Sequence, residues 1–292
     1  MAVDAIAPGG IKVIITAAIL LAFATVMIVL RFLARMRSQS LGIDDWASLT
    51  SYAFLVGVTT CHFLLFSSQG YGGAPLDDFT PEQLSHFLLM TYTDTILYIC
   101  CTAAIKMSIL LLFRRIFVTR AFGVITAVLA GVLIVWFLCV LFLQIFFCKP
   151  VSASWIPAET EHCLYKTRFY QAISISNILW DFTLLFLPLP MVWRLNTTNK
   201  RKLQLCGIFL VGIFICACSI LRTTVLCDWR QNNRSDIVWQ AGLWTVLECA
   251  IGVSCACMPP LLSLLKEWHL KALLVRQRCL ASNGAMMLQL NS

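Results

Sequence analysis

Long apolar segments separated by short polar connections run along almost the whole 292-residue chain. Seven of these segments reach the length of about 20 mostly apolar residues that a helix needs to cross a membrane. By that length criterion they cover roughly 11–30, 45–66, 86–112, 121–147, 169–193, 203–227 and 238–265. The pattern therefore predicts an all-α, polytopic membrane protein with seven transmembrane helices.

The seven spans fill most of the chain and leave no room for a separate soluble domain. We expect a short outer amino terminus over residues 1–10, a seven-helix membrane domain over 11–268 and a short basic cytosolic tail over 269–292. Only 12% of the residues are charged, whereas soluble domains contain about 25%. The lipid bilayer is therefore the expected environment of this integral membrane protein, in the plasma membrane or an endomembrane.

Lysine and arginine are unevenly distributed between the two sets of connections. Fourteen of the 22 follow the first, third and fifth spans or lie in the tail, and six lie on the opposite side. Cytosolic loops carry the excess of positive residues, so the amino terminus is predicted outside and the carboxyl terminus in the cytosol. We interpret the net charge of +8 as anchoring at the inner leaflet, and expect no nucleic-acid partner.

Most of the 14 cysteines lie inside spans, where cysteine acts as a small apolar filler. Cys148 and Cys163 instead bracket a predicted outer loop, in an oxidising compartment. We expect a disulfide between them; two free thiols are the alternative.

Five ionisable residues fall at membrane depth: Asp94, Lys106, Asp181, Arg222 and Glu248. Each costs about 2.5–3.5 kcal/mol near a helix centre, so such residues usually face the bundle interior and pair. We expect Glu248 and Asp94 to share Arg222 in the outer half of the bundle, with Asp181 below them. Lys106 is expected to extend to the cytosolic interface instead.

Two polar stripes at helical spacing accompany these charges. One contains Ser174, Asn177 and Asp181, and the other contains Trp244 and Glu248. The candidate ligand-binding residues are therefore Asp94, Asn177, Asp181, Arg222, Trp244 and Glu248. A purely structural role as polar contacts between helices is the alternative, and no catalytic residue is assigned.

Other features have simpler interpretations. Asp44 and Asp45 begin a span, where acids cap a helix and suit its dipole. Pro188 and Pro190, and the pair at 259–260, are expected to kink their spans and free carbonyls four residues earlier, such as that of Ala256. No two of the four histidines share a metal-ligand motif, so we expect no metal site, and no motif indicates a cofactor.

Several longer motifs resemble one known family. They are "GIDDW", "AIKMSILLLFRRIF", "CKPVSASW", "NILWDFTLLFLPLPMVWRL", "GIFLVGIFICACSILRTTVL" and "ECAIGVSCACMPPLLSLL", in this order. The set, within roughly 11–268, is similar to the fungal rhodopsin-domain family, the satratoxin-cluster type of integral membrane proteins. The same domain occurs in fungal receptors that carry a CFEM module. The resemblance implies seven helices and a fungal source, but no established chemistry.

Three function classes remain open. One is a membrane enzyme or accessory protein of fungal secondary metabolism, and another is a receptor for a small apolar ligand. A transporter is disfavoured because the spans show no internal duplication. A retinal protein is disfavoured because the seventh span contains no lysine for a Schiff base; Lys266 lies beyond its end.

Overall fold

The computed structural model describes residues 8–37, 41–67, 79–117, 119–156, 166–190, 199–232 and 239–261. Almost all of them are helical. The long helices are α1 (Pro8–Arg37), α2 (Ile43–Ser67), α3 (Pro81–Ile116), α4 (Arg120–Ile145), α5 (Lys166–Phe186), α7 (Asn199–Asn232) and the helix Trp239–Leu261, hereafter the Trp239 helix. A short 3-10 turn, η2 (Val151–Ser154), follows α4.

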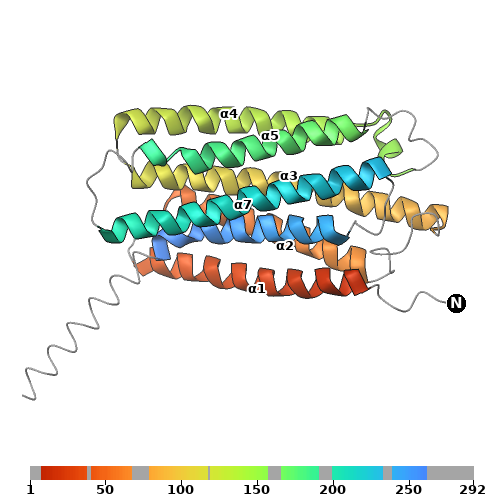
Figure 1. Cartoon of the computed structure of the whole chain (residues 1–292), viewed down its shortest axis with the longest axis horizontal. Coiled ribbons are helices and arrows are strands. Elements are labelled where there is room, and N and C mark those ends of the chain that lie inside the picture. The colour runs from red at the N-terminus through yellow and green to blue at the C-terminus, as the bar shows by residue number, and fades with distance from the viewer. Residues whose placement is uncertain are drawn as a thin grey trace, which may run out of the picture.

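The helices lie side by side along the long axis of the molecule, with α1 and α4 on opposite edges (Figure 1). Successive helices run in opposite directions, as short connections between spans require. The central helix is α3, which packs against α2, α4 and α5. It begins at a capping box, in which Thr80 and Gln83 exchange hydrogen bonds and Pro81 occupies the first turn.

The distribution of side chains is that of a protein embedded in lipid. Ile19 and Met36 on α1, and Val128 and Val135 on α4, are exposed, whereas Asp181, Glu248 and Lys106 are buried. Buried apolar residues of α2, α3 and the Trp239 helix, including Leu55, Ile99 and Val253, form the main core cluster. The chain is therefore a multi-pass integral membrane protein.

Six of these helices are long and apolar enough to cross a membrane, and α5 is the exception among the long helices described. Gln171, Asn177 and Asp181 make α5 more polar than its neighbours. It nevertheless packs inside the bundle against α3 and α7, and this contact buries its polar stripe. The seven-helix prediction is confirmed, while the two sides of the membrane remain a prediction.

Helix boundaries differ from the predicted spans most clearly at α5. Its predicted span continued to residue 193 and was to be kinked at Pro188 and Pro190, but the helix ends at Phe186. Pro188 has no backbone N–H, and a proline disfavours helical geometry at the residue before it, here Leu187. After a turn at Leu187 and Pro188, residues 189 and 190 are helical again, so the span is interrupted at the first predicted proline. The continuation to residue 193 lies outside the described residues. The predicted tail, 269–292, lies outside the described residues.

Candidate functional site

A line of polar side chains runs along α3 at intervals of four residues: Asp94, Tyr98, Thr102 and Lys106. Four residues turn an α-helix through about 400°, so each step shifts the line by about 40° around the axis. The line consequently faces α2 at Asp94, the Trp239 helix at Tyr98, and α5 at Lys106. This rotation distributes the buried charges among different neighbours.

Tyr98, midway along α3, is the hub of the innermost polar contacts. Its hydroxyl donates to Oε1 of Glu248 at 2.8 Å. Nδ2 of Asn177 lies 3.1 Å from both that hydroxyl and the same carboxylate oxygen. Asn177 and Glu248 are each only 3% exposed. With Arg222, which stacks on the ring, these residues form what we call the tyrosine centre.

Arg222 occupies this centre without a direct ion pair to any carboxylate that the structure describes. Its guanidinium carbon lies 3.7 Å from the centroid of the Tyr98 ring, within cation–π range. Its Nε donates to the hydroxyl of Thr245 at 3.0 Å. In the described part of the chain, Arg222 forms no ion pair within 4 Å. Arg222 lies close enough to Glu248 and Asp94 to interact with both electrostatically, but the predicted sharing does not take the form of a direct ion pair. The tyrosine ring takes up the guanidinium face, and the tyrosine hydroxyl donates to Glu248.

Two acceptor atoms of the centre have no donor. Oε2 of Glu248 and Oδ1 of Asn177 are both buried, and neither accepts a hydrogen bond from a residue that the structure describes. A buried polar atom without a partner costs about 1–3 kcal/mol, and more when the group is charged. The tyrosine centre is thus incompletely paired. Tyr98 was not among the predicted site residues, although its place four residues after Asp94 was a usable signal.

Lys106 lies closer to the C-terminal end of α3 and forms an ion pair. Its ammonium contacts Oδ1 of Asp181 on α5, and Ser219 on α7 donates to Oδ2 of the same carboxylate at 2.8 Å. Both charged side chains are less than 9% exposed. The prediction that Lys106 reaches the membrane interface is wrong. Because α5 packs against this face of α3, the carboxylate of Asp181 meets the lysine inside the bundle.

Asp94 lies apart from Glu248 and faces α2. Its Oδ1 is 3.3 Å from Nδ1 of His62, and that nitrogen is 2.8 Å from the carbonyl oxygen of Val58. The other candidate, Trp244, is partly buried one turn before Glu248. Of the six candidate ligand residues, the structure gathers Asn177, Arg222 and Glu248 around Tyr98. It does not gather Asp94 or Asp181 there, and a ligand-binding role for any of the six stays a prediction.

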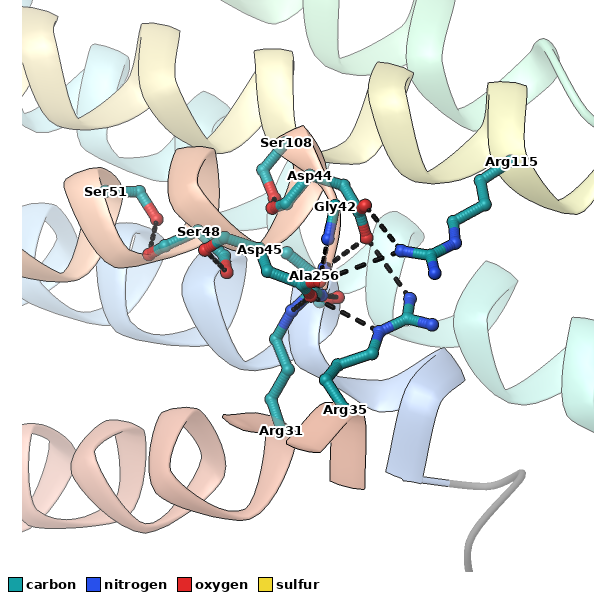
Figure 2. Close-up of polar contacts among 10 residues, drawn as sticks. All are labelled: Arg31, Arg35, Gly42, Asp44, Asp45, Ser48, Ser51, Ser108, Arg115 and Ala256. Atoms are coloured by element: carbon teal, nitrogen blue, oxygen red, sulfur yellow. Dashed lines mark hydrogen bonds and ion pairs between the residues drawn. The ribbon is translucent and has the colours of Figure 1, made fainter. Parts of the chain in front are cut away.

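A second polar cluster lies at the C-terminal end of α3, towards the predicted cytosolic side (Figure 2). We call it the arginine cluster: Arg31 and Arg35 from α1, Asp44 and Asp45 from α2, and Arg115 from α3. Arg31, which is fully buried, donates to Asp45 at 2.8 Å and to Asp44 at 2.7 Å. All four carboxylate oxygens accept a hydrogen bond, the last from the backbone N–H of Gly42.

The arginine cluster also holds the end of the Trp239 helix. Nη1 of Arg31 donates to the carbonyl of Ala256, four residues before Pro260. Pro260 has no N–H to offer that carbonyl, so the arginine replaces the missing helical hydrogen bond. The prediction that Ala256 needs another partner is confirmed. Asp44 and Asp45 do lie in the first turn of α2, but capping alone understates them, because they also neutralise buried arginines.

Other candidate chemistry is sparse. Cys148 is disulfide-bonded and buried. Its predicted partner, Cys163, lies outside the described residues, so the pairing stays a prediction. Among the described residues, no three histidine, cysteine or acidic side chains are grouped to hold a metal ion.

Three related proteins share substantial parts of this sequence. A SAT4 family membrane protein of Emericella nidulans is 30% identical over 219 residues, covering 73% of this chain and 55% of its own length. The polyenoic acids biosynthesis gene cluster protein Ba17b of Metarhizium anisopliae is 26% identical, covering 85% and 72%. The satratoxin biosynthesis SC1 cluster protein 4 of Stachybotrys chartarum is 26% identical, covering 58% and 62%.

The chain thus spans about half the length of the Emericella relative and under two thirds of the Stachybotrys one. No solved structure matches it. A family model, the fungal rhodopsin domain, matches residues 30–267, which include the whole tyrosine centre and the whole arginine cluster. The chain belongs to the fungal rhodopsin-domain family.

Proposed function

We propose that this protein serves fungal secondary metabolism from within the membrane, and that the tyrosine centre binds a small apolar substrate or product there. Two of the relatives are named for biosynthesis gene clusters of polyenoic acids and satratoxin. The observation that carries the binding role is the pair of buried acceptors without donors, on Glu248 and Asn177.

The physical argument is a contrast in pairing. Polar contacts that only hold helices together gain most when their acceptors are used, as in Asp181, where Lys106 contacts one carboxylate oxygen and Ser219 donates to the other. Glu248 uses one oxygen and leaves the other empty, although Arg222 lies on the same tyrosine. An ionisable group with an unpaired atom at membrane depth is costly, and such groups commonly mark ligand or substrate sites.

Deletion and complementation in the native fungus test the proposal. The deletion strain should lose or stall at least one secondary metabolite, measured by mass spectrometry of culture extracts. The wild-type gene and Thr224→Val should restore it; Glu248→Gln should not. Thr224 is a matched control because its exposed hydroxyl bonds only within its own helix, α7. Unchanged metabolites in the deletion strain would contradict the proposal.

A receptor is the second candidate, and one observation favours it. The Trp239 helix carries Glu248 in the tyrosine centre and, two turns later, Ala256 in the arginine cluster. A ligand at Glu248 could therefore act on the predicted cytosolic end through a single helix. Altered growth or gene expression in the deletion strain, with unchanged metabolites, would favour the receptor over the biosynthetic role.

A further inference from the structure

We propose that the tyrosine centre recognises the hydroxyl group of a neutral apolar molecule. This inference rests on the proposed binding role and names the chemical class of the ligand. It follows from the donors and acceptors that Tyr98, Asn177, Arg222 and Glu248 leave unused.

The unused acceptors come from two different helices. Oε2 belongs to Glu248 on the Trp239 helix, and Oδ1 belongs to Asn177 on α5. Oε1 of Glu248 accepts from the Tyr98 hydroxyl and from Nδ2 of Asn177, and Nδ2 also donates to that hydroxyl. These bonds fix both side chains. Because Nδ2 of Asn177 makes these bonds, its Oδ1 is the atom left over. The ligand must therefore offer a hydrogen-bond donor.

The unused donors belong to Arg222 on α7. Its Nε bonds to Thr245, and neither Nη group donates a hydrogen bond within the described residues. The Tyr98 ring holds the guanidinium by its face, which leaves the N–H groups at its edge available. The ligand should therefore also offer a hydrogen-bond acceptor.

A hydroxyl group satisfies both requirements with one oxygen, since it accepts from Arg222 and donates to Glu248 or Asn177. A carboxylate or phosphate would pair with Arg222 but would face the carboxylate of Glu248. An ammonium group would pair with Glu248 but would face Arg222. Ethers and ketones accept but donate nothing, so the acceptors would stay unsatisfied. The remainder of the ligand is apolar because Tyr98 lies at the middle of a membrane-spanning helix.

Water has the same chemistry as a hydroxyl, so the test must separate a bound alcohol from a hydrated centre. The probe is dodecanol carrying a diazirine, crosslinked to the full chain in lipid nanodiscs, with labelled peptides identified by mass spectrometry. Competitors are unlabelled dodecanol, dodecyl methyl ether, dodecanoate and dodecylammonium, which share one chain length. Labelling should fall on α3 or the Trp239 helix, near Tyr98 or Glu248, and dodecanol should compete about tenfold better than the other three.

Glu248→Gln provides a change of selectivity that a structural role would not produce. The amide keeps an oxygen for Tyr98 and Asn177 but replaces the free acceptor by a donor. The preference for dodecanol over its methyl ether should therefore fall by about tenfold, the equivalent of one hydrogen bond to a charged group. Thr224→Val should keep the wild-type preference.

Labelling elsewhere in the chain, no competition by dodecanol, or equal competition by all four compounds would overturn the inference and leave a water-filled centre. An unchanged preference in Glu248→Gln would do the same. None of these measurements depends on metabolism. A deletion strain with a lost metabolite would keep the proposed function even if alcohol binding failed, and the reverse result would keep the alcohol site alone.

Discussion

The arginine cluster and the tyrosine centre are both buried and charged, yet they differ in how completely they are paired. In the arginine cluster, Arg31 has an acceptor for Nε and for each Nη group, and every carboxylate oxygen has a donor. In the tyrosine centre, two acceptors have no donor among the described residues, and Arg222 forms no direct ion pair with any of them. The same ingredients, guanidinium and carboxylate, give a closed network in one region and an open one in the other.

The difference suggests a way to separate structural charges from functional ones in this membrane protein. A closed network loses stability when any member is removed, because the partners remain buried without compensation. An open network has little pairing to lose at its unused atoms, so substitution there should change binding rather than folding. Four sets of variants test this distinction, in order of decreasing effect on stability.

The largest effect is expected for Arg31→Leu. It leaves Asp44, Asp45 and the carbonyl of Ala256 without their shared donor, so the loss should reach about 5 kcal/mol, the upper end for a broken buried pair. Membrane-fraction yield and thermal unfolding in detergent measure it. Arg114→Leu, which removes an exposed arginine near Arg115, is the control and should stay close to wild type. Equal behaviour of the two variants would mean that the cluster is not structural.

Lys106→Met is expected to cost about 4 kcal/mol, because Asp181 keeps its charge with only Ser219 as a partner. Adding Asp181→Leu should recover most of that loss, since no charge then remains buried. The coupling is read from the unfolding free energies of the wild type, the two single variants and the double variant. Additive losses would show that the two side chains do not interact.

Glu248→Gln is expected to change the unfolding free energy by no more than about 1 kcal/mol, the size of one ordinary hydrogen bond. The substituted atom, Oε2, makes no bond, and the remaining oxygen still accepts from Tyr98 and Asn177. The preference for dodecanol over its methyl ether should nevertheless fall, and metabolite production should be lost. If Glu248→Gln were as unstable as Lys106→Met, Glu248 would belong to a closed network. The contrast between the arginine cluster and the tyrosine centre would then be wrong.

Pro260→Ala should have the smallest effect, within about 1 kcal/mol, because alanine restores a helical N–H to the carbonyl of Ala256. The informative measurement is its combination with Arg31→Lys, which loses the forked donor geometry. The lysine variant should be less destabilised when residue 260 is alanine than when it is proline. Identical losses in the two backgrounds would show that the bond between Arg31 and Ala256 contributes nothing.

The sequence predicts the seven helices because each apolar segment is long enough to cross the lipid. Even α5 was predicted, because apolar residues separate its polar positions. The tyrosine centre was predictable in part: Asn177 and Glu248 stood out as polar residues within apolar spans. Their partners did not, because helical spacing places residues on a face but leaves open which neighbouring helix that face meets. Lys106 shows this well, since its pairing depends on α5 and α7 covering α3.

The arginine cluster escaped prediction for a different reason. Arginines near a span end were counted as anchors to the inner leaflet, and acids in a first turn as caps, so their mutual contact was not considered. The spacing of Arg31 and Arg35, one turn apart and followed by two adjacent acids, was a usable signal. Only packing could show that Arg31 is fully buried rather than in contact with lipid headgroups.

The bond between Arg31 and Ala256 joins positions 225 residues apart in the chain. During synthesis, Arg31 is therefore made long before Ala256. Until the Trp239 helix is inserted, one group of the arginine lacks its acceptor, so the nascent bundle stays incomplete at that corner. Chains cut short before residue 256 should therefore lack this contact and be less stable in the membrane than the full chain.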